Sequence, residues 1–237
     1  MAQLWELLEI EKGLTAVMGS GGKTGLLYEL AEELRPYGTV LLATTTHIMR
    51  PPQYPFAATA AELASALTSH GAVCAGSFTA EGKLTAPDFP GWETAADFVL
   101  VEADGSKRLP AKAHETWEPV LPPQRRRTVC VLGASAFGKT IRQAAHRPAL
   151  YAALAGVTED TVITPELAAR VLMAEGSFDV IYVNQIDDPG FSPALTESFA
   201  RAVSCPVVVG SLHRRRWKNC ADRTLFPHHT ENPRIIE

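Results

Sequence analysis

A glycine-rich turn between an apolar run and a helical pattern most constrains the fold of this chain. Residues 14–18 are mostly apolar, and the turn follows at once as Gly19, Ser20, Gly21, Gly22, Lys23 and Thr24. Apolar residues then recur three and four positions apart through residues 26–34, which is the spacing of one helix face. A strand, a glycine turn and a helix in this order are typical of a phosphate-binding loop, where main-chain amides at the helix N-terminus converge on an anion.

Lys23 and Thr24 carry the chemistry of this turn. We expect Lys23 to reach the β and γ phosphates of a nucleotide and the Thr24 hydroxyl to coordinate Mg²⁺. The G-x-x-G-K-T spacing is shorter than the common G-x-x-x-x-G-K-[ST], because Val17 stands where the longer pattern needs a glycine. It resembles the loop of Mur-type ligases. A plain glycine turn with a surface lysine is the alternative.

A second segment also fits a phosphate loop. Residues 133–140 (GASAFGKT) match the longer pattern letter for letter and follow a strand-like run at 128–132. Pro148 comes eight residues after this loop and would break or kink the helix that should hold the phosphate. Phe137 is bulky for such a loop. We therefore predict that the first loop binds the nucleotide and that the second at most helps to hold an anion.

Two acids follow the apolar run at 98–101. Glu102 and Asp104 point the same way on an extended chain. Carboxylates at the end of a central strand suit a Mg²⁺–phosphate site, where one holds the metal and the other orients or deprotonates a nucleophile. We predict Lys23, Glu102 and Asp104 as catalytic residues, with Thr24 and Asp104 at the metal. A turn closed by an Asx-type hydrogen bond is the alternative.

Further polar residues are candidates for substrate contacts. Three threonines end a strand predicted at 39–43, and their hydroxyls can ligate Mg²⁺ or touch a phosphate. The proline-rich segment 107–123 is expected to form a long loop over the active face, with Lys112 as a further cation. The predicted substrate-binding residues are Thr44, Thr45, Thr46, His47, Lys107, Arg108, His146 and Arg147.

The apolar run at 180–183 ends in Asn184-Gln185-Ile186-Asp187, which is similar to the N-K-x-D turn that reads guanine in GTPases. In that turn the aspartate accepts from the base and the asparagine braces the loop. Gln185 replaces the lysine whose stem covers the base. We predict base recognition by Asn184 and Asp187 and leave ATP or GTP open.

The rest of the chain favours one α/β domain. Strand-like and helical segments alternate, which predicts a three-layer, P-loop NTPase-like fold with a mostly parallel sheet over residues 1–212 and a partly ordered or packed C-terminal tail at 213–237. The net charge of −4 gives no reason to expect a nucleic acid partner. No apolar run reaches the roughly 18 residues of a membrane span, and the four cysteines lack C-x-x-C spacing. We expect a cytoplasmic protein with free thiols.

The order of GSGGKT, TTTHI, VEADGSKRLPAKAHETWEPVLP, GASAFGK, HRP and NQID resembles the YqeC family over about residues 10–212. That resemblance implies a P-loop NTPase-like accessory protein in the maturation of a selenium-dependent molybdenum hydroxylase or its cofactor. It supports Gly19 to Thr24, Thr44 to Thr46, Glu102, Asp104, His146, Arg147, Asn184 and Asp187 as site residues. Gly25 stands where a second threonine often occurs, and His47 where a lysine is common.

We therefore predict an NTP-binding and NTP-hydrolysing maturation factor that uses Mg²⁺ with ATP or GTP. One alternative is an NTP-dependent ligase or kinase that acts on a small acidic cofactor precursor. Another is a non-catalytic chaperone, in which nucleotide orders a docking surface. The partners predicted are the nucleotide and a molybdenum hydroxylase or its cofactor, with the oligomeric state left open.

Overall fold

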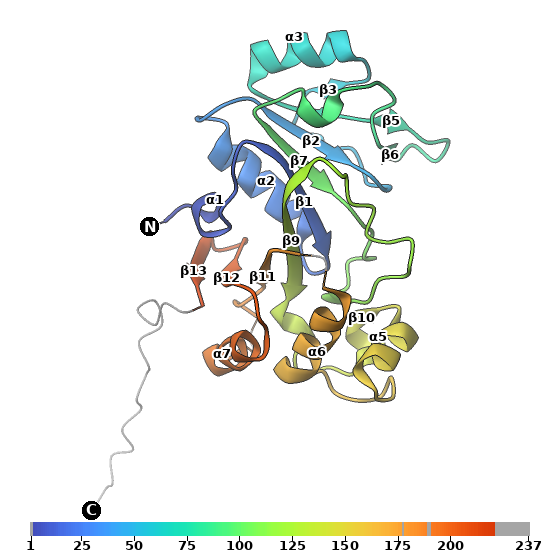
Figure 1. Ribbon diagram of the computed structural model, residues 1–237, viewed down its shortest axis with the longest axis vertical. Helices are drawn as coiled ribbons and strands as arrows, with labels where there is room; N and C mark the ends of the chain where they lie inside the picture. The colour runs from blue at the N-terminus through green and yellow to red at the C-terminus, as the bar shows by residue number, and fades with distance from the viewer. Residues whose placement is uncertain (1, 177, 189–190, 221–237) are drawn as a thin grey trace, which may run out of the picture.

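A nine-stranded sheet forms the centre of the computed structural model, which describes residues 2–176, 178–188 and 191–220 (Figure 1). The strand order is β13-β12-β11-β9-β1-β7-β2-β4-β3, and every neighbouring pair is parallel except β12 with β13. The strands are β1 (Gly13–Gly19), β2 (Val40–Thr44), β3 (Phe56–Ala57), β4 (Ala72–Ala75), β7 (Phe98–Glu102), β9 (Arg125–Gly133), β11 (Val180–Asn184), β12 (Val207–Ser211) and β13 (Arg216–Asn219). The predicted mostly parallel α/β fold is confirmed.

Helices cover both faces of this sheet, which gives three layers (Figure 1). The helices α1 (Leu4–Leu7) and α2 (Lys23–Leu34) pack on one face. The other face is covered by α3 (Ala60–His70), α5 (Pro148–Ala155), α6 (Pro165–Glu175) and α7 (Pro193–Ala202). Alternation along β1 divides its side chains between the layers, because Val17 faces α2 whereas Ala16 and Met18 face the opposite layer.

Local capping explains where two of these helices begin. Thr59 accepts from the amide of Glu62 at 3.2 Å, and the Glu62 carboxylate accepts from the amide of Thr59 at 3.2 Å, so a capping box starts α3. Thr164 caps α6 by accepting from the amide of Leu167, and Pro165 occupies the first helical position. Both helices thus begin at a threonine whose side chain satisfies a free main-chain amide.

Several short elements complete the fold. A short hairpin forms from β5 (Ser77–Phe78) and β6 (Leu84–Thr85). The segment before Pro148, where a break or kink was expected, consists of α4 (Ile141–Ala144) and β10 (Ala145–His146), and α5 begins at Pro148. The long loop contains β8 (Ala111–Lys112), which pairs with β10 in parallel. The two short 3-10 turns are η1 (Trp92–Thr94) and η2 (Ala134–Ala136).

The segment expected to be a tail begins with structure. Residues 216–219 form β13, which pairs with β12, and the rest of that predicted tail, residues 221–237, lies outside the described residues. The domain boundary at residue 212 stays a prediction. Within the described ranges, no helix is both long enough and apolar enough to cross a bilayer. Cys74 and Cys130 are buried free thiols, and burial raises the pKa of Cys74 to about 12.

Candidate functional site

The glycine turn joins β1 to α2 in a backbone conformation that other residues rarely adopt. Gly19 has φ +91° and Gly21 has φ +96°. A Cβ on Gly19 would lie 2.4 Å from the carbonyl oxygen of Val131, and one on Gly21 would lie 2.3 Å from the amide nitrogen of Gly133. The loop therefore needs glycine both for its torsion angles and for its close approach to β9.

Lys23 points back into this loop and meets both predicted carboxylates. Its Nζ donates to the carbonyl of Gly19 at 2.8 Å and to the hydroxyl of Ser106 at 3.1 Å. The same atom lies 2.9 Å from Oδ1 of Asp104 and 3.7 Å from Oε1 of Glu102. The Lys23 side chain is only 2% exposed, so this charge is held between acids that end the central strand β7.

Glu102 stands beside the Thr24 hydroxyl at the first turn of α2. Thr24 Oγ1 donates to Glu102 Oε2 at 2.9 Å. Burial raises the pKa of Glu102, although the Lys23 ammonium and the Thr24 hydrogen bond act in the opposite direction. A carboxylate and a hydroxyl therefore share one small space next to the glycine loop.

Asp104 is fully buried and is surrounded by donors. It accepts from the amide of Gly19 at 2.8 Å, and its Oδ2 lies 2.5 Å from Nε2 of His114. Lys112 Nζ lies 3.5 Å from the same oxygen. Burial alone would raise the pKa of Asp104, but Lys23, His114 and Lys112 together hold it below its ordinary value. Asp104 is thus a charged anchor that fixes the start of the loop.

Sequence reasoning missed the partners that lie beneath this anchor. Lys112, which we expected to meet a substrate, is buried and pairs with Glu118 Oε2 at 2.7 Å. The same Glu118 oxygen lies 2.5 Å from Nη1 of Arg147, and His114 Nδ1 lies 2.8 Å from Glu175 Oε2. Residues 112–118 mix bases and acids, which indicates only that ion pairs can form there, and the local sequence carries no signal for the pairing with Arg147 or Glu175.

The threonines after β2 mainly hold the backbone of the neighbouring segments. Thr44 Oγ1 donates to the carbonyl of Glu102 at 2.9 Å, and Thr45 Oγ1 donates to the carbonyl of Val120 at 2.7 Å. The amide of Thr46 donates to the Thr44 hydroxyl at 3.0 Å. These bonds fix β2 against β7 and the long loop, and the substrate role of the three threonines stays a prediction.

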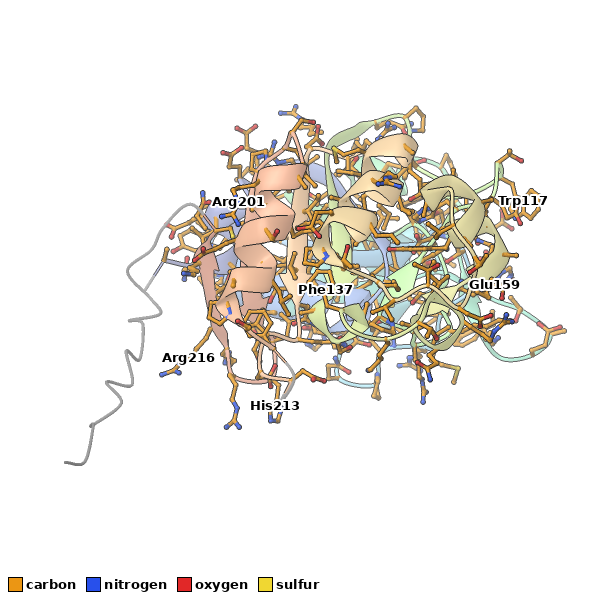
Figure 2. The ribbon with its side chains drawn as sticks, turned by 90° about the horizontal axis from the view of Figure 1, so that it is seen from below. Trp117, Phe137, Glu159, Arg201, His213 and Arg216 are labelled. Carbon is orange, nitrogen blue, oxygen red and sulfur yellow. The ribbon has the colours of Figure 1, made fainter. Side chains whose placement is uncertain are left out.

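The segment 107–123 is tied to the phosphate loop and also reaches solvent. The hydroxyl of Ser20 donates to the carbonyl of Leu109. Farther along, Trp117 is 67% exposed and projects from the edge of the molecule (Figure 2). The segment therefore runs from the glycine loop to the surface, and its position over an active face stays a prediction.

The Asn184–Asp187 turn lies on the other side of the glycine loop. Asn184 Nδ2 donates to the carbonyl of Gly21 at 2.8 Å, and Asn184 Oδ1 accepts from the amide of Leu212 at 3.2 Å. Gln185 accepts from the Ser135 hydroxyl at 2.6 Å. Asp187 is exposed. Asn184 thus braces the phosphate loop, and base recognition by Asp187 stays a prediction.

The second loop-like segment, 133–140, lacks the helix that a phosphate site requires. It passes through η2 into α4, which has only four residues. Phe137, labelled in Figure 2, packs against Phe199 of α7 with ring centroids 6.2 Å apart. Lys139 is exposed. The bulky residue of this segment thus contributes to packing against α7, and the short α4 offers little to hold a phosphate.

A pocket of about 810 Å³ opens at the glycine loop. It brings together several predicted residues, namely Gly21, Gly22, Lys23, Thr24, His47, Glu102, Lys107, Arg108 and His146. The lining does not include Asp104, Arg147, Asn184, Asp187 or the three threonines. Within the described chain, Nδ1 of His146 is buried without a hydrogen-bond partner. Burial, Lys112 and Arg147 lower the pKa of His146, which favours the neutral imidazole.

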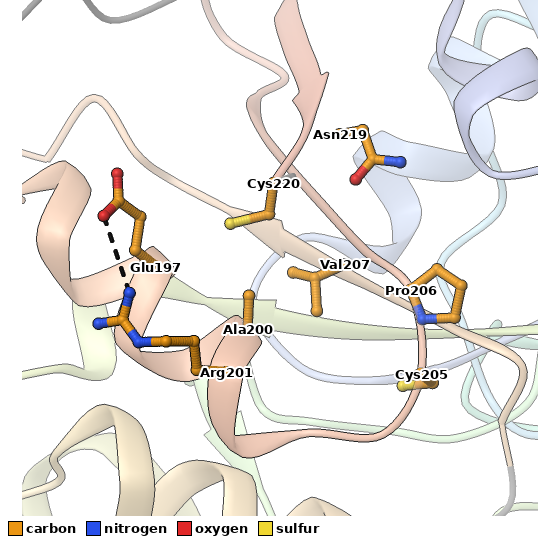
Figure 3. A pocket seen from close by; sticks show the side chains of 8 residues that line it. All are labelled: Glu197, Ala200, Arg201, Cys205, Pro206, Val207, Asn219 and Cys220. Carbon is orange, nitrogen blue, oxygen red and sulfur yellow. Dashed lines mark ion pairs between the residues drawn. The ribbon is translucent and has the colours of Figure 1, made fainter. Parts of the chain in front are cut away.

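A smaller pocket of about 360 Å³ lies elsewhere, between α7 and the end of the sheet (Figure 3). Its rim carries an ion pair between Glu197 and Arg201 at 3.9 Å, with Cys205 and Cys220 nearby. No residue that the sequence predicted for the site lines it. The glycine-loop pocket is therefore the candidate functional site.

The chain is similar in sequence to a known protein family. Residues 15–149 match the family described as YqeC protein. An Escherichia coli (strain K12) protein named "Uncharacterized protein YqeC" is 36% identical over 176 residues, which cover 69% of each chain.

A solved structure also shows a partial likeness. It is the signal recognition particle 54 kDa protein from Aeropyrum pernix K1 in complex with GDP, at 14% identity and a TM-score of 0.44. The match covers 89% of this chain but only 44% of that one. The family match extends over the glycine loop, the carboxylates of β7 and the segment that follows them, and together with the Escherichia coli relative it shows that this chain belongs to the YqeC family.

Proposed function

We propose that this protein binds a nucleoside triphosphate at residues 19–24 and hydrolyses it with Mg²⁺. The observation that carries the proposal is at the start of α2, where Lys23 contacts both Glu102 at the end of β7 and Asp104 just after it, and Thr24 contacts Glu102. A glycine loop that leads into a helix N-terminus offers amides and a partial positive charge to phosphate oxygens. Phosphate oxygens entering there would compete with Asp104 and Glu102 for the Lys23 ammonium.

The residues at the loop also suit Mg²⁺. Thr24 and Glu102 place two oxygen donors 2.9 Å apart beside the pocket. In the described part of the chain, no three His, Cys, Asp or Glu side chains form a metal cluster. Few protein ligands suit a cation that keeps waters and takes substrate phosphates. Bound there, Mg²⁺ would neutralise charge that develops on the phosphates.

Roles for the acids follow from their surroundings. We propose that Glu102 serves the metal and the attacking group, because it contacts Thr24 and lines the pocket. For Asp104, predicted as a metal ligand, we propose an anchoring role, because its oxygens already face Lys23, Gly19 and His114. We therefore propose Glu102, in place of the predicted Asp104, as the carboxylate at the metal.

The choice of base and the partner enzyme rest on separate observations. Base selection by Asn184 and Asp187 rests on the position of this turn beside the glycine loop, and it leaves ATP and GTP open. The proposed role in the maturation of a molybdenum hydroxylase or its cofactor rests on the family resemblance. Two alternatives remain: a chaperone without turnover, and an NTP-dependent ligase or kinase that acts on an acidic precursor. The cations that line the pocket favour the ligase or kinase, because they suit an acidic substrate.

Thermal unfolding with ATP or GTP, each with and without Mg²⁺, tests the nucleotide site. A ligand at about one hundred times its Kd stabilises by roughly 2.7 kcal/mol, which is a rise in Tm of about 5–10 °C for a chain of this size. We expect this rise in the wild type and in Lys139→Ala, and its loss in Lys23→Ala. Thr24→Val should keep the fold and lose the part of the rise in Tm that depends on Mg²⁺.

Turnover is measured separately, as phosphate release by the wild type and Glu102→Gln. Loss of a residue that positions or deprotonates a nucleophile costs about 10²–10⁴-fold in rate. We therefore expect nucleotide binding to persist in Glu102→Gln while release falls by at least about a hundredfold. A shift lost in Lys139→Ala but kept in Lys23→Ala would refute the assignment of the loop, and binding without any release would favour the chaperone.

A further inference from the structure

The glycine-loop pocket has an uneven distribution of charge. Its lining contains the cations Lys23, Arg50, Lys83, Lys107 and Arg108, whereas Glu102 is the single acid among the described residues that line it. Its volume of about 810 Å³ is in the upper part of the roughly 300–1,000 Å³ range of small-molecule sites. Charge of one sign in a concave site attracts ligands of the opposite sign.

Four of these cations differ from the fifth in their surroundings. Lys23 is buried against Asp104 and Glu102. The other four, which we call the rim cations, are Arg50, Lys83, Lys107 and Arg108, and all are exposed. Arg50 lies over the ring of Phe56 at 5.1 Å, and within the described residues no rim cation forms a salt bridge with a carboxylate. The rim cations are therefore available to a ligand.

The sheet order separates the rim cations from the predicted base site. The glycine loop follows β1, and Asn184 ends β11, which lies beyond β9 on one side of it. On the opposite side, Glu102 ends β7 and His47 follows β2. A Cβ on Gly22 would lie 2.4 Å from Asn184 Nδ2, whereas none of residues 184–187 lines the pocket. A nucleotide with its base over β11 would thus extend away from the pocket's β7–β2 side.

We propose that the rim cations form a second anion subsite, which binds a phosphate-bearing small molecule other than the nucleotide. The inference rests on the proposed function, because the nucleotide must occupy the other side of the loop. Phosphate is the anion of choice, since guanidinium groups such as those of Arg50 and Arg108 bind its oxygens through paired hydrogen bonds, with lysines adding point charges. His146 also lines this pocket, with Nδ1 unsatisfied, and adds a neutral polar group beside the anion.

Inorganic phosphate is the probe for this subsite. Phosphate is titrated into the full chain in the presence of Mg²⁺ and a saturating non-hydrolysable analogue of ATP or GTP, and Tm is followed at constant ionic strength. Lys107→Gln/Arg108→Gln removes two rim cations. Arg126→Gln/Lys139→Gln is the matched control, because it removes the same charge from two exposed cations outside the pocket.

We expect phosphate to raise the Tm of the wild type and the control beyond the rise from the analogue. The rim variant should need about tenfold more phosphate for the same rise, as for the loss of one or more charged hydrogen bonds. No added shift with phosphate, while the analogue still binds, overturns the subsite and leaves the proposed function intact. A response to malonate in place of phosphate overturns the phosphate assignment.

The nucleotide-free protein separates the two proposals. If neither analogue shifts Tm, the proposed function fails, and phosphate is then titrated alone into the wild type, the rim variant and Lys23→Ala. A phosphate shift that Lys23→Ala keeps and the rim variant loses supports the subsite by itself. A shift that depends on Lys23 instead places the anion at the glycine loop and overturns the subsite.

Discussion

Nε2 of His114 lies 2.5 Å from Oδ2 of Asp104, and this contact connects the phosphate loop to a distant helix. The same Asp104 oxygen accepts from the amide of Gly19 at 2.8 Å, while His114 Nδ1 lies 2.8 Å from Glu175 of α6. Burial lowers the pKa of His114, but the carboxylates of Asp104 and Glu175 raise it by a larger amount, so the net shift of the pKa is upward. The position of the first loop glycine is thus coupled to an imidazole whose protonated form is favoured by Asp104 and Glu175.

Stability should therefore fall as His114 loses its proton. Because its pKa is raised above the ordinary value of 6.5, its contribution is fully present below that pH and is lost as pH rises through the folded pKa. Between about pH 6 and pH 9 we therefore expect wild type to lose more unfolding free energy than His114→Gln. Urea unfolding measures this, exposed His70→Gln is the control, and equal slopes for wild type and His114→Gln would contradict it.

Removal of Lys112 should destabilise the fold strongly. Its side chain is fully buried and lies 2.7 Å from Glu118 and 3.5 Å from Asp104, and it donates to the carbonyl of Gly105 at 2.5 Å. Breaking a buried ion pair from one side costs about 3–5 kcal/mol, since the other charge stays buried. We expect Lys112→Met to lower the free energy of unfolding by about 3 kcal/mol and exposed Lys139→Met to change it by less than about 0.5 kcal/mol. Urea titration distinguishes these outcomes, and a loss below about 1 kcal/mol would show that Arg147 alone satisfies Glu118.

Asp187 should affect the choice of base and leave the fold unchanged. The side chain is exposed, whereas the neighbouring Asn184 is bonded to the phosphate loop. A hydrogen bond to a charged group is worth about 1.5–3 kcal/mol, or about tenfold or more in affinity. Asp187→Ala should therefore make the affinities for ATP and GTP similar, without a change in the Tm of the free protein. Calorimetric titration with both nucleotides tests this, with exposed Asp88→Ala as the control. A base preference that survives in Asp187→Ala would exclude this residue from base selection.

The fold could be predicted where a strand or helix carries its own signal. The apolar runs at 98–101 and 180–183 are long enough to indicate buried strands, and both lie in the sheet. The strands β3, β8 and β13 have two to four residues. So short a segment has no readable period, and its strand state depends on a partner far along the chain. Their pairing could not be predicted from local sequence.

The candidate site shows the same division. The contact between Lys23 and the acids after β7 follows from general chemistry, because parallel strands bring their carboxyl ends to one edge of the sheet. The role of His114 could not be inferred, since its partner Glu175 is 61 residues away on a helix whose acids would ordinarily face solvent. Burial of Lys112 was hidden for the same reason, as only the folded loop brings Glu118 and Asp104 to it.

A comparison of two glycines distinguishes the two loop candidates. Gly21 has φ +96° and its Cβ would lie 2.3 Å from the amide of Gly133, whereas Gly138 has φ +82° with nothing within 4 Å of its Cβ. A left-handed torsion costs a non-glycine residue about 1–2 kcal/mol, and a clash with backbone adds to that cost. We therefore expect Gly138→Ala to lose about 1 kcal/mol of unfolding free energy and keep its nucleotide-induced rise in Tm. Gly21→Ala should lose more than about 2 kcal/mol and the whole of that rise, because the alanine would push the loop away from β9 and from the Asn184 brace. Urea unfolding and thermal shift measure these two quantities. If Gly138→Ala lost the nucleotide-induced rise in Tm and Gly21→Ala kept it, the nucleotide would lie at the second loop.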